Sequence, residues 1–287
     1  MMSFTTLPNM SPKLTSATLL SHGPMSAFVS YEITDDGGEP MTETGCYVYL
    51  TSEPENKQKC IAENFDGKEG KIKLRIGNLE RNAHYEFLPF ARNTVGETLG
   101  TAIKYDTSDA ITLNETGELT QLMGNHLYEY TQLTIAGTLN GEDLSCLRLM
   151  MGRDNNNAST PGKLSDIDLA DVHLAAGGMV GPYHHEAAEN QIVQGTFAGC
   201  EKLTHLVLPA DATTIEKDAF ADCTSLREIE IPASAGSILP SSGCTALEAI
   251  TVSPANAHYQ SQDGVQLNAE RNRIVWFTIG KKLKYCL

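Results

Sequence analysis

The 287-residue sequence is poor in aromatic and basic residues and contains no long apolar stretch. Aromatic side chains make up 7% of the residues, and 21 Lys and Arg stand against 36 Asp and Glu, a formal net charge of -15. Because an acidic surface repels phosphate backbones, we expect no nucleic-acid partner. No apolar run reaches the roughly 18 residues of a membrane-spanning helix, so we expect no transmembrane segment.

Export and catalytic signals are missing as well. Residues 1–8 lack the basic and apolar regions of a signal peptide, so the protein either stays inside the cell or has had its signal removed. There is no nucleophile elbow, phosphate-binding loop or Rossmann glycine run. Paired carboxylates for glycoside hydrolysis are defined by their separation in space, which the sequence does not give.

One segment has the chemistry of metal ligands. Residues 184–189 contain two histidines and two glutamates, and in a helix His185 and Glu189 would share a face. A zinc site needs three or four ligands held by a second layer of contacts. Because Gly181 and Pro182 precede the segment, we favour a solvent-exposed loop and expect no metal site.

The seven cysteines are an odd number, so at least one thiol is unpaired. Cys46 and Cys60 could pair across a β-sandwich, but nothing in their spacing requires it. Cys146 falls in a segment with helical spacing. The pairing of Cys46 with Cys60 therefore stays open at this point.

Two segments near the end of the chain are nearly the same. Residues 197–209 and 220–232 share a Phe, a Cys, three aliphatic positions and a Pro at a spacing of 23 residues. A period of about 20–29 residues with aliphatics at L-x-x-L-x-L is typical of a leucine-rich-repeat solenoid. Such a fold presents surfaces rather than a deep catalytic pocket. We therefore expect a protein that is not an enzyme and needs no cofactor.

The same pattern predicts four repeats and their core. The repeats fall at residues 164–169, 203–208, 226–231 and 247–252, with an irregular fifth at 133–135. Phe197 and Phe220 should stack in the core. The aligned Cys200, Cys223 and Cys244 should be buried small hydrophobes, because parallel side chains have poor disulfide geometry. No Phe precedes Cys244 and two residues are missing there, which predicts a distorted edge.

The flanks of the repeats differ in character. Residues 116–123, with Thr116 as a cap, and residues 140–151 have helical spacing. Residues 256–268 and 274–277 are expected to form a closing hairpin that includes Trp276. These segments predict a helical lead-in and a cap at the end of the solenoid.

The first hundred residues show alternating stretches separated by turns. Strands are predicted at residues 27–33, 46–50, 71–76, 84–91 and 101–105, with a polar loop after Leu50. Short strands with a turn about every ten residues favour an antiparallel sandwich. Pro89 should lie at an edge or bulge, because proline cannot donate to a ladder.

Leu79 and Tyr85, six residues apart, fit a tyrosine corner, in which the hydroxyl returns to the backbone. With the Ala91-x-Asn93-x-x-Gly96 hairpin that follows, residues 13–107 resemble the fibronectin type III family. The usual strand tryptophan is absent, and Tyr47 or Tyr49 is expected to fill its space. No Arg-Gly-Asp tripeptide occurs, so the sequence gives no support for an integrin-type role.

The repeats also resemble a known family. Ile215, Ala219, Phe220, Cys223 and Leu226, followed by Ile229 and Ile231-Pro232, match the pattern of BspA-type leucine-rich-repeat bacterial surface proteins. The resemblance extends over about residues 110–280 and places a second domain at 108–287. It implies an extracellular or outer cell-surface location, with the export signal removed, and a role in adhesion.

Side chains that flank the buried aliphatics should point outward along the strands, since side chains alternate. This set is acidic and contains one histidine: Asp166, Asp168, His205, Val207, Glu228, Glu230, Ala249 and Thr251. It could dock a basic protein patch or a polar polymer. It could equally be a solvated surface that keeps the repeats from aggregating.

The sequence thus predicts a mostly β protein with some α, a fibronectin type III-like β-sandwich followed by a short leucine-rich-repeat solenoid. The first functional hypothesis is adhesion to a host or bacterial surface protein or glycan through the solenoid face. A second is an accessory carbohydrate-binding module with Tyr183, Tyr259 or Trp276 as sugar platforms. The third is a purely structural spacer.

Overall fold

The computed structural model describes residues 8–63 and 65–277 and divides the chain into two compact units at the junction of Asp109 and Ala110. The boundary expected from the sequence, between residues 107 and 108, lies two residues earlier. We call the first unit the sandwich and the second the repeat stack.

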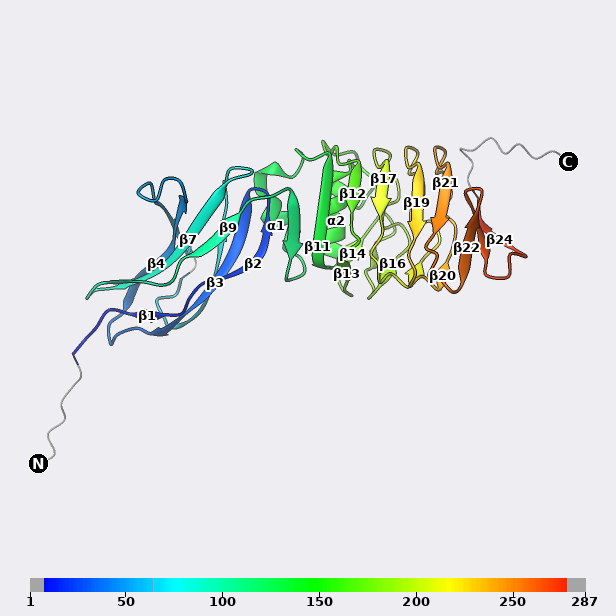
Figure 1. The fold of residues 1–287 in the computed structure, drawn as a ribbon. Coiled ribbons are helices and arrows are strands. Elements are labelled where there is room, and N and C mark those ends of the chain that lie inside the picture. The colour runs from blue at the N-terminus through cyan, green and yellow to red at the C-terminus, as the bar shows by residue number, and fades with distance from the viewer. Residues whose placement is uncertain (1–7, 64, 278–287) are drawn as a thin grey trace, which may run out of the picture. The chain divides into compact units, whose positions relative to one another are not determined.

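The sandwich consists of antiparallel strands in two sheets (Figure 1). In one sheet β3 pairs with β1, β2 and β6. In the other, β4 and β7 pair with each other, β5 lies beyond β4, and β8 and β9 pair with β7. This is the fibronectin type III-like arrangement expected from the sequence. The strands are β1 Lys13–Leu14, β2 Thr18–Gly23, β3 Ser26–Asp35, β4 Met41–Leu50, β5 Gln58–Ile61, β6 Gly70–Ile76, β7 His84–Asn93, β8 Glu97–Leu99 and β9 Ile103–Asp106.

All five predicted strands of this unit are present, as β3, β4, β6, β7 and β9. The prediction missed β1, β2, β5 and β8. Strand β5 lies inside the segment predicted as a polar loop, because Gln58 and Lys59 are polar and exposed and only four residues pair with β4. Pro89 lies where the partner of β7 changes from β9 to β8, an irregular position that needs no donor from it.

The tyrosine corner is formed as expected. The backbone N–H of Glu80 donates to the Tyr85 hydroxyl at 3.0 Å, and both Leu79 and Tyr85 are buried. Neither Tyr47 nor Tyr49 belongs to the core cluster between the sheets, although Tyr49 is itself buried, so neither fills the space of the missing tryptophan there. The aromatic core of the sandwich is Tyr31, Tyr85, Phe87 and Tyr105. Alternation along β4 turns Cys46 and Val48 inward, which leaves the two neighbouring tyrosines on the outer side.

Parallel strands stacked side by side form the main ladder of the repeat stack (Figure 1). Each strand carries a buried aliphatic residue at its centre, and Ile135, Ile167, Leu206, Ile229 and Ile250 are examples. The ladder is longer than predicted, because it begins with β10, and the irregular fifth repeat is a complete strand, β11. Its members are β10 Ala110–Leu113, β11 Gln132–Leu139, β12 Asp166–Asp168, β17 His205–Val207, β19 Glu228–Ile231 and β21 Ala249–Val252, with β13 Val172–Leu174 also paired to β11.

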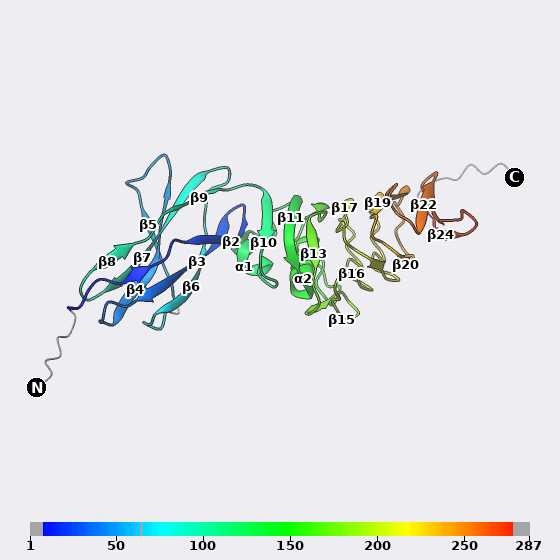
Figure 2. The ribbon, with the colours of Figure 1, turned by 60° about the horizontal axis from the view of Figure 1, so that its bottom comes forward.

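A second, shorter parallel ladder runs through the same repeats (Figure 2). It pairs β16 with β18 and β18 with β20. Beside it lies a two-stranded hairpin, and an antiparallel meander follows the last repeat. These strands are β14 Met179–Val180, β15 His185–Glu186, β16 Gln191–Ile192, β18 Thr214–Ile215, β20 Ser237–Ile238, β22 Tyr259–Gln262, β23 Val265–Asn268 and β24 Ile274–Trp276.

Both predicted helices are present, but the first begins later than predicted. Helix α1 is Leu119–Met123, followed by the 3-10 turn η1 Gly124–His126, and Thr116 does not cap it. Gly117, at φ 79°, separates Thr116 from the helix, and the Asp143 carboxylate accepts the N–H groups of Gly117 and Leu119 instead. Helix α2 is Gly141–Met150, and Asn140 and Asp143 form its capping box. No helix among the described residues is long and apolar enough to cross a membrane.

Aromatic rings form a continuous column in the core of the repeat stack. Phe197 and Phe220 lie parallel, 5.5 Å apart with an angle of 2° between their planes, and both are fully buried. The next repeat lacks a Phe, and a distorted edge was predicted there. At this position Trp276 of β24 stacks on Phe220 at 6.3 Å, so that the closing meander supplies the missing ring. The Ser241 hydroxyl accepts the Phe220 N–H, whereas in the preceding repeat a backbone carbonyl, that of Ala219, accepts the Phe197 N–H.

The cysteines of the repeats form a second column. Cys200, Cys223 and Cys244 are free and buried. The Cys223 thiol donates to the Phe197 carbonyl at 3.1 Å, and the Cys244 thiol repeats this contact with Phe220 at 3.2 Å. Burial raises the pKa of Cys200 to about 11. The thiols thus act as small buried donors between successive repeats.

Arg148 of α2 lies next to Cys200, at the first repeat of this column. Its guanidinium is fully buried and donates to the carbonyls of Gly195, Thr196, Ala198 and Asp154 at 2.8–3.3 Å. In the following turn, the corresponding carbonyls of Ala219 and Ala221 accept the backbone N–H groups of Phe197 and Gly199 from the turn before. Arg148 supplies donors to the first turn, which has no preceding copy, and burial lowers the pKa of its guanidinium.

Candidate functional site

The outward residues of β12, β17, β19 and β21 form two aligned columns, which we call the strand face. Register places Asp166, His205, Glu228 and Ala249 opposite one another in the first column. The second column contains Asp168, Val207, Glu230 and Thr251. Parallel in-register pairing holds neighbouring strands about 4.8 Å apart, so side chains of one column form a continuous surface.

The strand face is acidic and largely open to solvent. Asp166, His205, Glu228 and Glu230 are exposed, whereas Asp168, Val207 and Thr251 are half-buried. His205 Nδ1 lies 3.1 Å from Asp166 Oδ1, and Asp168 accepts the Ala170 N–H at 2.9 Å. Among the described residues, no hydrogen bond or ion pair engages the carboxylates of Glu228 and Glu230. These two carboxylates are therefore available to an incoming group.

A shallow hollow of about 270 Å³ adjoins the second column at the ends of β17 and β19. Glu230 is the one charged side chain that lines it. The rest of its wall is mostly apolar or small: Ala170, Val207, Leu208, Ala210, Pro232, Ala233 and Ser253. The face and the hollow together place a carboxylate beside an apolar depression, which suits a side chain with an aliphatic stem and a positive end.

The alternation of residues along each strand predicts the columns but not the hollow. A signal for it exists, because Leu208-Pro209-Ala210 returns as Ile231-Pro232-Ala233 at the repeat spacing. Small residues that recur after each strand leave room where larger side chains would fill it. Only the structure shows that these positions open onto the second column.

The histidine-rich segment lies in a hairpin and not in a helix. His185 and Glu186 form the short strand β15, and His184 adopts φ 51° in the turn before it. Tyr183 contacts His185 edge-on at 6.3 Å and is 49% exposed. The extended backbone separates His185 from Glu189, so the helical spacing that would have brought them together does not occur.

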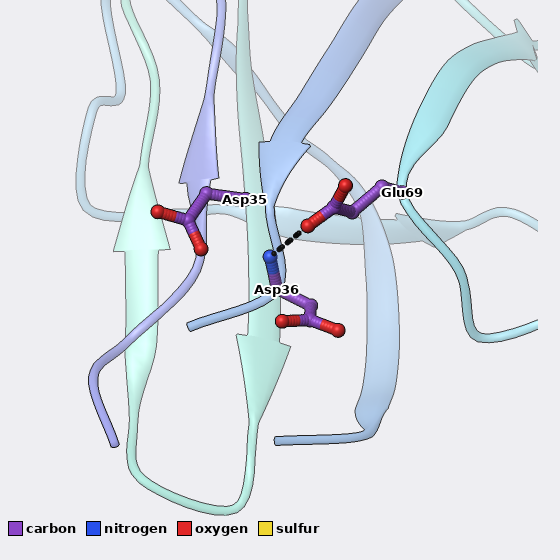
Figure 3. A group of neighbouring side chains, drawn as sticks. All are labelled: Asp35, Asp36 and Glu69. Carbon is purple, nitrogen blue, oxygen red and sulfur yellow. Dashed lines mark hydrogen bonds between the residues drawn. The ribbon is translucent and has the colours of Figure 1, made fainter. Parts of the chain in front are cut away.

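One acidic group stands out among the described residues, at the end of β3 (Figure 3). Its members are Asp35, Asp36 and Glu69. Asp35 forms an ion pair with Lys13 at 2.6 Å and accepts the Gly37 N–H. Glu69 accepts the Asp36 N–H at 2.9 Å, and Asp36 accepts the Gly38 N–H. These carboxylates hold the turn that joins β3 to β4.

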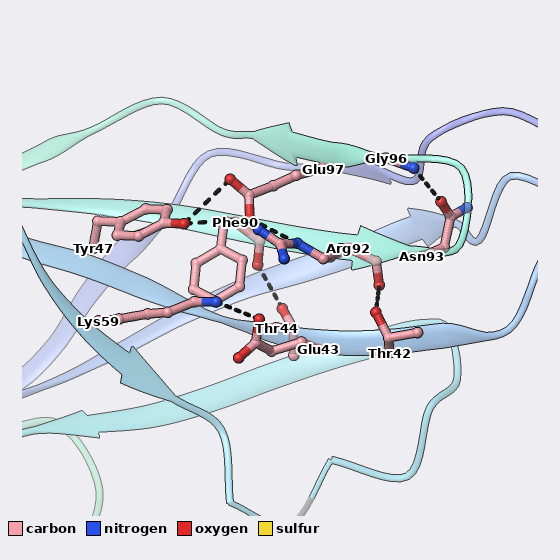
Figure 4. A network of polar contacts seen from close by, with 10 residues as sticks. All are labelled: Thr42, Glu43, Thr44, Tyr47, Lys59, Phe90, Arg92, Asn93, Gly96 and Glu97. Carbon is pink, nitrogen blue, oxygen red and sulfur yellow. Dashed lines mark hydrogen bonds and ion pairs between the residues drawn. The ribbon is translucent and has the colours of Figure 1, made fainter.

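Polar side chains seal the outer side of the β4–β7 sheet (Figure 4). The Tyr47 hydroxyl donates to Glu97, which also pairs with Arg92 at 2.8 Å. Lys59 pairs with Glu43 and lies 4.7 Å from the Phe90 ring centroid, and Phe90 is fully buried. Because the ring is covered, this face offers no open aromatic platform.

The three proposed sugar platforms differ in exposure. Trp276 is 4% exposed and belongs to the ring column. Tyr259 is half-buried, and its hydroxyl donates to the Gly236 carbonyl at 3.3 Å. Tyr183 alone among these candidates presents half of its surface to solvent.

The repeat geometry agrees with a known family. Residues 189–262 match the BspA type Leucine rich repeat region in six copies. The chain thus carries a BspA-type leucine-rich-repeat region, preceded by a fibronectin type III-like sandwich. No curated protein matches the chain.

Several solved structures are similar to parts of the chain. A fragment of titin is 17% identical over 33% of this chain and 31% of its own, with a TM-score of 0.27. The FN1–FN3 domains of chicken CNTN1 are 16% identical over 33% of both chains, with a TM-score of 0.28. A leucine rich cell surface protein from Faecalibacterium prausnitzii is 19% identical over 63% of this chain and 56% of its own, with a TM-score of 0.27. The chain therefore spans about a third to a half of these relatives.

Proposed function

We propose that this protein is a non-enzymatic binding protein of the bacterial cell surface or its surroundings, and that its repeat stack binds a partner through the strand face. The observation that supports the proposal is the alignment of two outward columns across four neighbouring strands of the ladder, with carboxylates on β12 and β19. The match of residues 189–262 to BspA-type repeats and the similarity to a leucine rich cell surface protein of F. prausnitzii support a location at the cell surface.

The charge of the strand face favours a basic protein surface as the partner. Complementary charges raise the association rate and fix the register of a complex. Glu228 and Glu230 would pair with Lys or Arg side chains, and the hollow next to Glu230 would receive an aliphatic stem. A glycan partner would instead need exposed aromatic rings, and the strand face has none.

The test is a binding screen of the full chain against immobilised extracellular-matrix proteins and glycans. A double variant, Glu228→Lys with Glu230→Lys, should weaken binding to any positive protein at least tenfold, about 1.4 kcal/mol. The matched control is Glu186→Lys with Glu189→Lys, which makes the same charge change outside the strand face. Equal loss in both variants, or no binding across the panel, would reject the proposal.

A dependence on salt separates this mechanism from apolar adhesion. Binding by the wild type should weaken as ionic strength rises, because exposed charge pairs are screened over about 10 Å at 0.1 M. The double variant should lose most of that dependence, whereas the control should keep it.

A further inference from the structure

The strongest unassigned feature is a pair of opposed cysteines in the sandwich. Cys46 of β4 and Cys60 of β5 are direct partners in the antiparallel register. Residues directly opposite on such strands point to the same side of the sheet. Cys46 is fully buried in the core cluster, and Cys60 packs against the same cluster. Both thiols are free in this structure.

The pairing pattern places their backbones at a distance that a disulfide can span. The Ala62 N–H bonds to the Thr44 carbonyl, two residues along the same register, so Cys46 and Cys60 also form a hydrogen-bonded pair. Such pairs have Cα atoms about 5.5 Å apart, within the roughly 4.4–6.8 Å range of disulfides. The strands are in close contact here, since a Cβ on Gly45 would lie 2.1 Å from the Cys60 carbonyl oxygen.

Of the two cysteines, only Cys60 is partly exposed. Cys60 lines an open cleft of about 580 Å³ together with Glu63, Arg75 and Leu79, and it is partly exposed at the edge strand β5. Its thiol donates to the Arg75 carbonyl at 3.5 Å, so it points between the two sheets. Cys46 lies behind it, out of contact with solvent. An external reagent would therefore meet Cys60 first.

We propose that Cys46 and Cys60 form a cross-strand disulfide when the protein meets a disulfide-bearing oxidant, a small molecule or another protein. The Cys60 thiolate attacks one sulfur of the oxidant, which forms a mixed disulfide and releases one thiolate. Cys46 then loses its proton and attacks the Cys60 sulfur, which releases the second thiolate. Two protein thiols are oxidised, one external disulfide is reduced to two thiols, and the two protons pass to the leaving thiolates.

The electrostatics make this reaction slow at neutral pH without preventing it. Burial raises the pKa of Cys46 to about 12. Burial, and to a smaller extent Glu63, also raises the pKa of Cys60, so that few molecules carry the attacking thiolate. The rate of oxidation should therefore increase with pH.

The test uses the full chain with Cys286→Ser, because Cys286 lies outside the described residues. The reduced, folded protein is incubated with oxidised glutathione at mildly alkaline pH, then denatured, alkylated with a maleimide and weighed. We expect a loss of two hydrogen masses, two fewer maleimide groups and a cross-linked peptide that joins Cys46 to Cys60. A protein that stops at a glutathione adduct, or that keeps all its thiols, would overturn the proposal.

Variants assign the roles of the two sulfurs. Cys46→Ala should accumulate the glutathione adduct on Cys60, because no second thiol can displace it. Cys60→Ala should not react at Cys46. The control, Cys146→Ala, removes a different buried thiol and should form the disulfide as the parent does. An intramolecular disulfide that forms in either variant would have to use another cysteine, and it would refute the mechanism.

Discussion

Both units bury apolar side chains between strands, but the specific contacts that hold them differ in how often they occur. In the sandwich each specific contact occurs once, as in the bond between the Tyr85 hydroxyl and Glu80 or that from Tyr105 to the Gly23 carbonyl at 2.5 Å. In the repeat stack the same contact returns in successive repeats, as in the thiol–carbonyl bonds of Cys223 and Cys244. When a contact is lost in the sandwich, no other contact of the same kind remains. When one is lost in the repeat stack, a series of equivalent contacts between successive repeats is interrupted.

The largest expected effect comes from breaking the ring column at its centre. Phe220→Ala removes a fully buried ring between Phe197 and Trp276 and should cost about 3–5 kcal/mol of unfolding free energy. Urea unfolding followed by the fluorescence of Trp276, the single tryptophan, measures it. Phe220→Leu should cost much less, since it keeps most of the volume. A cost below about 1 kcal/mol for the alanine variant would contradict the column as a main source of stability.

Removal of the buried guanidinium comes next. Arg148→Met keeps the volume but leaves several buried carbonyls without donors, and should cost about 3 kcal/mol. The control is Arg227→Met, whose side chain is 72% exposed and should change stability by less than about 0.5 kcal/mol. The same urea experiment compares the two. Equal effects would mean that Arg148 does not stabilise the first turn of the repeats.

Alkaline pH should weaken the repeat stack through its thiols. Burial raises the pKa of Cys200 from 9.0 to about 11, so the folded state holds this proton more tightly than the unfolded state. Its contribution is complete below pH 9 and is lost as pH rises through 11, about 2–3 kcal/mol in all. Unfolding free energies measured from pH 8 to 11 should fall less steeply in Cys200→Ala. An unchanged slope would contradict a buried thiol.

The smallest effect is expected from removing a contact that occurs once, the tyrosine-corner bond of the sandwich. Tyr85→Phe removes the acceptor of the Glu80 N–H and should cost about 1 kcal/mol. Hydrogen exchange read by mass spectrometry should show faster exchange at Glu80. Tyr128→Phe, on an exposed ring, serves as the control and should leave exchange and stability unchanged. Protection of the Glu80 amide in both variants would argue against the corner bond.

The difference between the units also explains what the sequence could predict. Periodicity placed Phe197, Phe220 and the cysteine column correctly, because a repeated contact leaves a repeated residue. It could not find Trp276 as the last ring of the column, since that ring comes from outside the pattern. Arg148 gave no signal either, because a buried guanidinium that bonds to carbonyls needs no acidic partner in the sequence.

The candidate site shows the same division. Alternation along each strand predicted which side chains flank the buried aliphatics, and register then aligned them. The hollow beside Glu230 is lined by residues from several successive repeats, and no single residue determines it. In the sandwich, Tyr47 and Tyr49 were misplaced because hydrophobic size alone does not tell which side of a strand faces inward.

The indole that ends the ring column has a consequence for how this protein can grow. Because the closing meander fills the place that the final repeat leaves without a Phe, and also bonds to Ile250 and Val252 of β21, gene duplication of a 23-residue unit before that repeat would leave the terminus unchanged. Each added unit would lengthen the molecule and extend its acidic columns, while both ends kept their existing contacts. The length of the repeat stack would then change in evolution without changing the contacts that close its two ends.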